Sequence, residues 1–120
     1  MDKEAIEKIK LAGKITAQVR EYGATLVKKD ASIVEILDKV EEKIVDLGGK
    51  PAFPAQISCN NIAAHFCPEE DDRTILTDQL VSLDVGVHVD GYIGDTAVTV
   101  DLSGEYGELV KAAKEALDAA

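Results

Sequence analysis

The sequence lacks the features that direct a protein to membranes or to nucleic acid. No run of about 18 apolar residues exists, so no segment is expected to span a bilayer. The opening residues, Met-Asp-Lys-Glu-Ala-Ile-Glu-Lys, contain no apolar stretch typical of a signal peptide. Lysine and arginine number only 13, against 23 aspartates and glutamates, so the net charge is −10. Without a basic stripe to bind phosphates, we expect neither nucleic acid nor a membrane surface as a partner.

Cysteine is also scarce. Cys59 and Cys67 are the only two, and their spacing matches neither a zinc knuckle nor a thioredoxin motif. We expect two free, reduced thiols in a cytoplasmic protein. The remaining composition, 46% hydrophobic and 30% charged over 120 residues, is ordinary for one soluble globular domain or part of one.

Two amphipathic helices are predicted near the N-terminus. Apolar residues recur every three or four positions from about Lys3 to Val27. A second helix follows Ser32, which with Glu35 fits a capping box, and it ends at Gly48-Gly49. We assign these two helices to the core and give them no chemistry.

A third helix is predicted to start near Glu105, after Ser103-Gly104. Its last stretch, Leu-Asp-Ala-Ala, contains no Gly, Asn or Pro that would close it. The pattern therefore predicts a chain that is truncated within a helix. Asp101 and the glutamates at the start of this helix are most simply surface charge.

The most informative segment is Leu83–Val100, which predicts a β-hairpin. Its alternating Val and Ile residues indicate two strands, and Asp90-Gly91 is a two-residue turn signal. With that turn, Asp84 and Asp95 lie on one face of the sheet as diagonal neighbours, with Cα atoms about 7–8 Å apart. The predicted register pairs four sets of residues: Val89 with Tyr92, His88 with Ile93, Gly86 with Asp95, and Asp84 with Ala97.

Two carboxylates so placed can converge on one divalent ion or on two ions about 3.5–4 Å apart. Gly86, opposite Asp95, is expected to leave open space for an ion. The simpler alternative is that both aspartates are solvated residues on the wet face of an antiparallel sheet. Aspartate is depleted in strands, and these two share a face in an otherwise apolar stretch, so the residues alone leave both readings open. His88 lies on the same predicted face, either at the rim of a pocket or in a structural role.

The segment Gly48–Pro68 is predicted to be irregular, with a short strand, a turn at Asn60-Asn61 and a second short strand. His65 lies there in the apolar run Ile-Ala-Ala-His-Phe. A lone histidine in such a setting is more often a core residue than a catalytic one.

Three segments together resemble the methionine aminopeptidases, and more closely their type II branch: Gly48–Pro54, Asn60–His65 and Asp84–Thr99. The resemblance extends over essentially all of the chain. It implies an α/β (α+β) chain with an antiparallel sheet covered by helices, belonging to the pita-bread fold. That fold consists of two pseudo-symmetric halves around a dinuclear metal centre. Residues 1–120 would be the N-terminal half of the catalytic domain and the opening helix of the second.

The resemblance also implies roles for four residues. Asp84 would be a terminal metal ligand, and Asp95 would bridge two divalent ions, Co²⁺, Mn²⁺, Fe²⁺ or Zn²⁺. His65 would be catalytic, because it would hydrogen-bond the substrate near the scissile peptide, and Phe53 would help to bind the substrate's methionine side chain. The substrates would be N-terminal peptides of nascent proteins. Cys67 departs from the family pattern, where a threonine or another small residue is expected.

The remaining ligands in this family, a histidine and two glutamates, come from the second half. The 120-residue chain alone is therefore expected to be inactive, and its uncovered surface to favour self-association. One alternative within the fold is an Xaa-Pro peptidase, which would carry an arginine where this chain has Asp95-Thr-Ala-Val-Thr99. Another is a non-catalytic pita-bread binding module, which retention of both aspartates disfavours.

Overall fold

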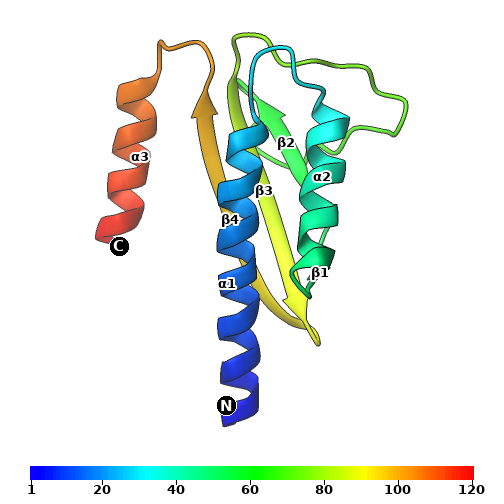
Figure 1. The fold of residues 1–120 in the computed structure, drawn as a ribbon. Coiled ribbons are helices and arrows are strands. Elements are labelled where there is room, and N and C mark those ends of the chain that lie inside the picture. Colours follow the sequence, from blue (N-terminus) through cyan, green and yellow to red (C-terminus); the bar gives the residue numbers. More distant parts are fainter.

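The computed structural model describes residues 1–120 as two helices packed on one face of a four-stranded antiparallel sheet, with a third helix beside it (Figure 1). The elements follow the order α1 (Lys3–Leu26), α2 (Ile33–Asp46), β1 (Lys50–Pro51), β2 (Gln56–Cys59), β3 (Leu80–Val89), β4 (Tyr92–Asp101) and α3 (Gly107–Ala119). β3 is central: β4 pairs with it along its whole length, and β1 and β2 share its other edge. No helix is both long and apolar enough to cross a membrane.

The predicted helices form where local signals place them. The Asp2 carboxylate accepts a hydrogen bond of 2.7 Å from the Ala5 amide and caps α1. Ser32 caps α2 in the same way, through a bond of 3.3 Å from the Glu35 amide. α2 is followed by Gly48, whose φ of 95° is a conformation that only glycine adopts without strain. The boundaries predicted for both helices are confirmed.

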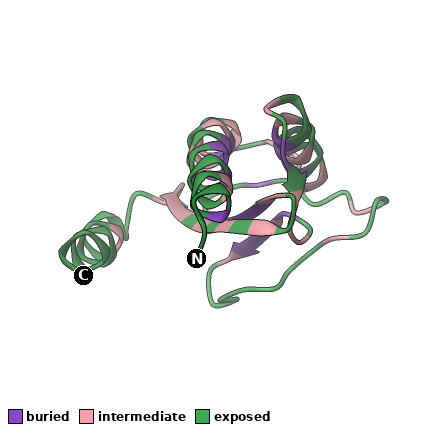
Figure 2. Cartoon of the chain, turned by 90° about the horizontal axis from the view of Figure 1, so that it is seen from below, coloured by how far each residue is buried: buried purple, intermediate pink, exposed green.

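The core lies between the helices and the sheet. Alternate residues of β3 point toward α1 and α2 and are completely buried: Val81, Leu83, Val85 and Val87. They meet Val19 of α1 and Val40 and Ile44 of α2 in one apolar cluster. Figure 2 shows the buried residues where the helices and the sheet face one another, whereas no helix covers the opposite face of the sheet. That uncovered face carries the intervening residues of β3.

The hairpin register is confirmed residue by residue. Asp90 and Gly91 have φ of 50° and 86°, as a two-residue turn with two left-handed residues requires. The ladder pairs His88 with Ile93, Gly86 with Asp95 and Asp84 with Ala97.

Two predictions about other segments need correction. The short strand expected after Asn60-Asn61 is absent, because residues 60–79 form no strand. Asn60 instead turns the chain away from the sheet with φ of 56°, and its side-chain oxygen accepts a bond of 3.0 Å from the Leu80 amide. Asp101, predicted as plain surface charge, accepts hydrogen bonds from the Ser103 and Tyr106 amides and holds the turn before α3.

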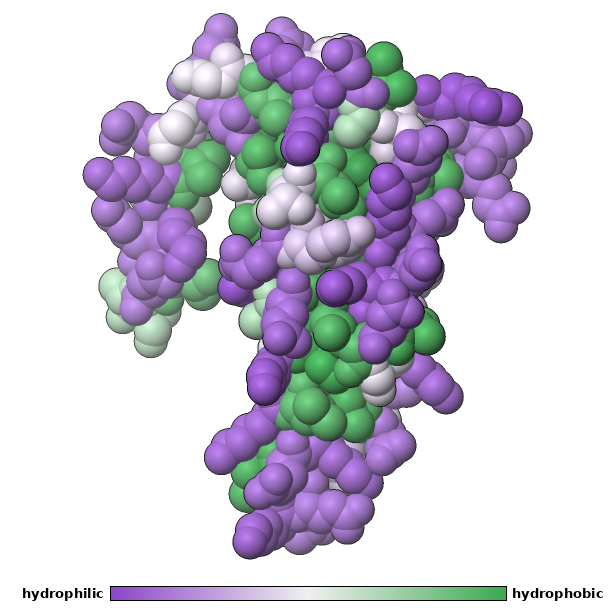
Figure 3. Space-filling view, in the orientation of Figure 1, coloured by the Kyte–Doolittle hydropathy of each residue, from purple (hydrophilic) through white to green (hydrophobic).

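α3 has an uncovered apolar side. It contains no buried residue, and Leu109 and Leu117 are 59% and 69% exposed. Figure 3 shows hydrophobic patches on the side of α3 nearest the rest of the chain and at its lower end, on an otherwise hydrophilic helix.

Candidate metal centre

Asp84 and Asp95 lie on the face of the sheet that no helix covers. Their strand neighbours Val85 and Thr96 point to the helices, so both carboxylates point away from them. Asp95 is opposite Gly86, two residues along β3 from Asp84, which makes the aspartates diagonal neighbours as predicted. Diagonal residues of an antiparallel pair have Cα atoms about 7–8 Å apart. Asp84 is half-buried and Asp95 is exposed.

The negative charges of Asp84 and Asp95 repel one another. Desolvation by burial raises the pKa of Asp84, the negative charge of Asp95 raises it further, and His65 opposes both. Two carboxylates that repel one another at a partly desolvated site are stabilised by a cation between them. Carboxylate oxygens suit hard or borderline divalent ions.

The donor set of this chain is nevertheless only part of a metal site. No group of three or more His, Cys, Asp or Glu side chains is placed to hold one ion. Two carboxylates on one face of the sheet suit a divalent metal in their chemistry, but they are too few ligands for a closed site.

Phe53 occupies the space that the sequence analysis assigned to an ion. A Cβ at Gly86 would collide with the ring of Phe53, and its distance to both Cδ1 and Cζ would be 2.7 Å. The prediction of open space above Gly86 is therefore wrong, because the glycine accommodates an aromatic ring. Since Gly86 pairs with Asp95, the half-buried Phe53 ring lies beside the candidate metal face. The loop between β1 and β2 carries it there.

His65 is exposed, so the interpretation as a buried core histidine is wrong. It lies in the long segment between β2 and β3 with φ of 65°, a left-handed conformation that is uncommon for residues other than glycine. Its charge opposes the rise in the pKa of Asp84. The structure thus brings Asp84 and Asp95 together on one face of the sheet, and His65 is linked to them by its electrostatic effect on Asp84.

His88 serves the hairpin turn. Its Nδ1 accepts a hydrogen bond of 3.1 Å from the Gly91 amide. It also lines a small pocket of about 210 Å³ together with Lys50 and residues 89–91. His88 shares a face of the sheet with the two aspartates, but it lies next to the turn of the hairpin and has a structural role there.

Gln56 is a residue near the site that the sequence analysis missed. It pairs directly with Asp84 from β2, and its Oε1 is buried without a hydrogen-bond partner. An alternation of polar and apolar residues in β2 could have indicated that Gln56 shares a face with Asp84. β2 has only four residues, which is too short for a clear alternation.

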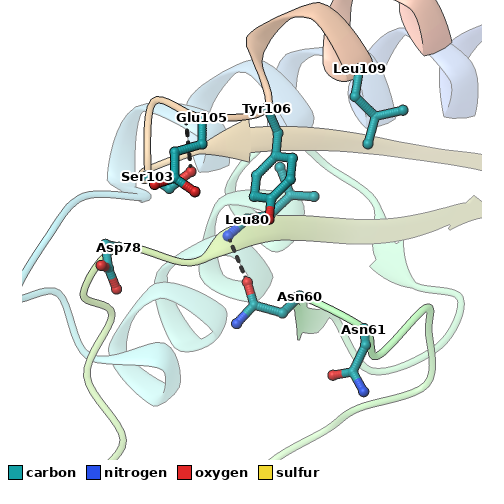
Figure 4. A pocket seen from close by; sticks show the side chains of 8 residues that line it. All are labelled: Asn60, Asn61, Asp78, Leu80, Ser103, Glu105, Tyr106 and Leu109. Atoms are coloured by element: carbon teal, nitrogen blue, oxygen red, sulfur yellow. Dashed lines mark hydrogen bonds between the residues drawn. The ribbon is translucent and has the colours of Figure 1, made fainter.

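A pocket of about 500 Å³ lies at the other end of the sheet, away from the two aspartates. In Figure 4 the side chains of Tyr106 and Leu109, from the start of α3, lie across it from Asn60 and Asn61. A dashed line marks the bond between Asn60 and the Leu80 amide. None of the candidate site residues lines this pocket, which belongs to the junction between the sheet and α3.

The sequence profile described as metallopeptidase family M24 matches residues 7–120. The methionine aminopeptidase of Archaeoglobus fulgidus is 54% identical over 121 residues, covering 100% of this chain and 41% of that protein. The methionine aminopeptidase of Pyrococcus horikoshii is 49% identical over 116 residues, covering 96% of this chain and 39% of that protein. The chain thus spans about two-fifths of the length of these curated relatives.

Solved structures show the same fold. The crystal structure of the methionine aminopeptidase from Thermotoga maritima matches with a TM-score of 0.88 and 28% identity, over 98% of this chain and 51% of that one. The X-Pro aminopeptidase of the same organism matches with a TM-score of 0.69 and 19% identity, over 84% of this chain and 29% of that one. The predicted fold class, an α/β half of a pita-bread domain, is confirmed.

Proposed function

Because the chain belongs to metallopeptidase family M24, we propose that it forms the first half of a methionine aminopeptidase domain, which removes N-terminal methionine from nascent proteins in the cytoplasm. The observation that carries the proposal is the placement of Asp84 and Asp95 on one uncovered face of a hairpin. The identity of 54% to an archaeal methionine aminopeptidase supports the choice of substrate.

Asp84 and Asp95 would hold two divalent ions, with Asp84 as a terminal ligand and Asp95 as the bridge. Ions bound there would lower the pKa of a water molecule and polarise the scissile carbonyl. Co²⁺, Mn²⁺, Fe²⁺ and Zn²⁺ all accept such ligands. No group of three His, Cys, Asp or Glu side chains of this chain is placed to hold one ion, so the remaining ligands would come from a further polypeptide segment. The 120-residue chain alone is then inactive.

His65 would act on the substrate. It is exposed on the segment between β2 and β3, and its charge acts on Asp84. Its ring nitrogens would hydrogen-bond a peptide bound over the carboxylates. A neutral imidazole can donate one hydrogen bond to the peptide and so orient the scissile bond. This role requires the ring to lie within about 2.6–3.2 Å of the group it contacts.

Phe53 would form one wall of the pocket for the methionine side chain. Its ring lies over Gly86, next to the strand position of Asp95. An apolar ring beside the reacting centre favours a thioether, which makes favourable contacts with aromatic rings worth about 0.3–1.5 kcal/mol.

Peptide hydrolysis by the complete protein, with both halves present, tests the proposal. We expect it to release methionine from Met-Ala-Ser when Co²⁺ or Mn²⁺ is added, and to lose activity in EDTA. Cleavage of Xaa-Pro peptides with Met-Ala-Ser left intact would replace the proposal by an Xaa-Pro peptidase. A complete protein that holds no metal and gains no activity with added metal would be a binding module.

A further inference from the structure

Helix α1 contacts β4 at the two residues that flank Asp95. At Gly94 the contact is a close approach: a Cβ there would lie 2.5 Å from Oγ1 of Thr16 and 2.9 Å from the carbonyl oxygen of Ala12. At Thr96 it is a hydrogen bond, in which Nη1 of Arg20 donates to the side-chain oxygen over 2.9 Å.

The two contacts act from behind the sheet. Side chains alternate along a strand, so Gly94 and Thr96 face α1 while Asp95 between them faces the opposite side. Neither contact can therefore touch a metal ion that Asp95 binds. Each can only determine where the backbone of Asp95 lies and in which direction its carboxylate points.

Within residues 1–120, β4 is an edge strand. It pairs with β3 on one side only, and its other edge has no partner in this chain. Asp84, by contrast, lies on β3, which is paired on both edges, and opposite Gln56 of β2. Within this chain, Asp95 thus stands on the strand that has fewer hydrogen-bonded neighbours.

The Arg20 guanidinium is itself held in place. Its Nε and Nη2 donate to Oε1 of Glu21 over 3.3 and 3.1 Å, while Nη1 bonds Thr96. Its side chain is 32% exposed, so the bond to Thr96 is partly shielded from water. A planar guanidinium that donates on two sides holds its partner in a more defined geometry than a lysine ammonium would.

We propose that Arg20 and Thr96 are positioning residues for metal binding: through them, α1 fixes the orientation of Asp95. The inference rests on the proposed function, since it assumes that Asp95 holds metal. Partners that orient a metal ligand typically change metal affinity by about 10–100-fold when they are removed. A bond that served the fold alone would change stability and leave metal affinity unaltered.

A double-mutant cycle in the complete protein separates these roles. The variants are Arg20→Met, which keeps the aliphatic stem, Thr96→Val, which keeps the shape, and the two together. Lys14→Met is the matched control, because it removes a cation from an exposed position of the same helix. Co²⁺ dissociation constants from calorimetry, and the visible spectrum of bound Co²⁺, report on the site, while urea unfolding in EDTA reports on the fold.

We expect each single variant to weaken Co²⁺ binding about 10-fold and to alter the Co²⁺ spectrum. The double variant should bind no more weakly than either single one, because both remove the same bond. Arg20→Lys should recover part of the affinity, and Lys14→Met should bind as the unmodified protein does.

Two failures are distinguishable. If the unmodified protein and Lys14→Met bind no Co²⁺, the proposed function is wrong and this inference falls with it. If the unmodified protein binds Co²⁺ and Thr96→Val binds it equally tightly with the same spectrum, the positioning role alone is wrong. Thr96→Val carries this test even if Arg20→Met does not fold.

Discussion

The ring of Phe53 lies directly over Gly86, the residue that pairs with Asp95 across the hairpin. An aromatic side chain from a loop thereby comes to the edge of a carboxylate pair, at a place where only glycine leaves room for it. Changing this glycine is expected to disturb substrate binding more than the fold.

In Gly86→Ala the new methyl group collides with the ring, which must move aside. Overpacking of this kind costs about 1–3 kcal/mol of stability. Because the half-buried Phe53 can shift toward solvent, we expect the fold to survive and the KM for Met-Ala-Ser to rise more than kcat falls. Gly13→Ala is the control, since nothing lies within 4 Å of a Cβ at that helical position. An unchanged KM in Gly86→Ala would contradict the placement of Phe53 in the pocket.

Asp101 predicts a pH dependence of stability. The Ser103 hydroxyl donates to its carboxylate, and with the Tyr106, Ser103 and Gly104 amides it lowers the pKa of Asp101 from the ordinary value of 3.8. The unfolded chain then binds more protons than the folded one, so stability rises with pH in this range. The contribution is fully present above pH 3.8 and is lost as the pH falls through the folded-state pKa.

Urea unfolding between about pH 2 and 6 checks this contribution by comparison with Asp101→Asn. The difference in unfolding free energy between the two proteins should shrink as the pH falls below 3.8. Asp71→Asn, which removes an exposed carboxylate from the long loop, serves as the control. A difference that stays constant over the whole range would show that the hydrogen bonds to Asp101 do not stabilise the folded state.

The two cysteines should differ in reactivity. Cys67 is exposed, whereas Cys59 is half-buried and burial raises its pKa. Since the thiolate is the reactive form, a disulfide reagent at neutral pH should modify Cys67 quickly and Cys59 slowly. The fast phase should vanish in Cys67→Ser and persist in Cys59→Ser. Two equally fast thiols would contradict the burial of Cys59.

The 120-residue chain by itself is expected to self-associate. α3 buries no residue, Leu109 is 59% exposed, and β4 offers an unpaired edge. Exposed apolar surface next to an open strand favours pairing with a second copy. Light scattering at increasing concentration should show a dimer, which Leu109→Glu weakens. A monomer at all concentrations would contradict this expectation.

Much of the fold was predictable because its signals are local. Ser32 and Asp90-Gly91 determine a helix start and a turn through their own hydrogen bonds and φ angles, and strand alternation then places Asp84 and Asp95 on one face. The packing of Phe53 on Gly86 could not be predicted, since it depends on how a loop folds back over the sheet.

The bond between Arg20 and Thr96 could not be predicted either, because it joins residues 76 positions apart and depends on how α1 packs on the sheet. The apolar neighbours of His65 in sequence favoured a core residue, and that interpretation alone was wrong, because the segment that carries His65 lies on the surface. The metal and substrate roles of His65, Phe53, Asp84 and Asp95 remain predictions.

Metal content is the measurement that tests the central claim most directly. After purification in Mn²⁺ or Co²⁺ and gel filtration, the complete protein should retain about two ions per chain, as a two-metal site requires. Asp95→Asn should retain at most one ion and lose methionine release, while Asp71→Asn should match the unmodified protein in both respects. If Asp95→Asn holds as much metal and cleaves Met-Ala-Ser as fast as the unmodified protein, the two aspartates are surface residues and the account is wrong.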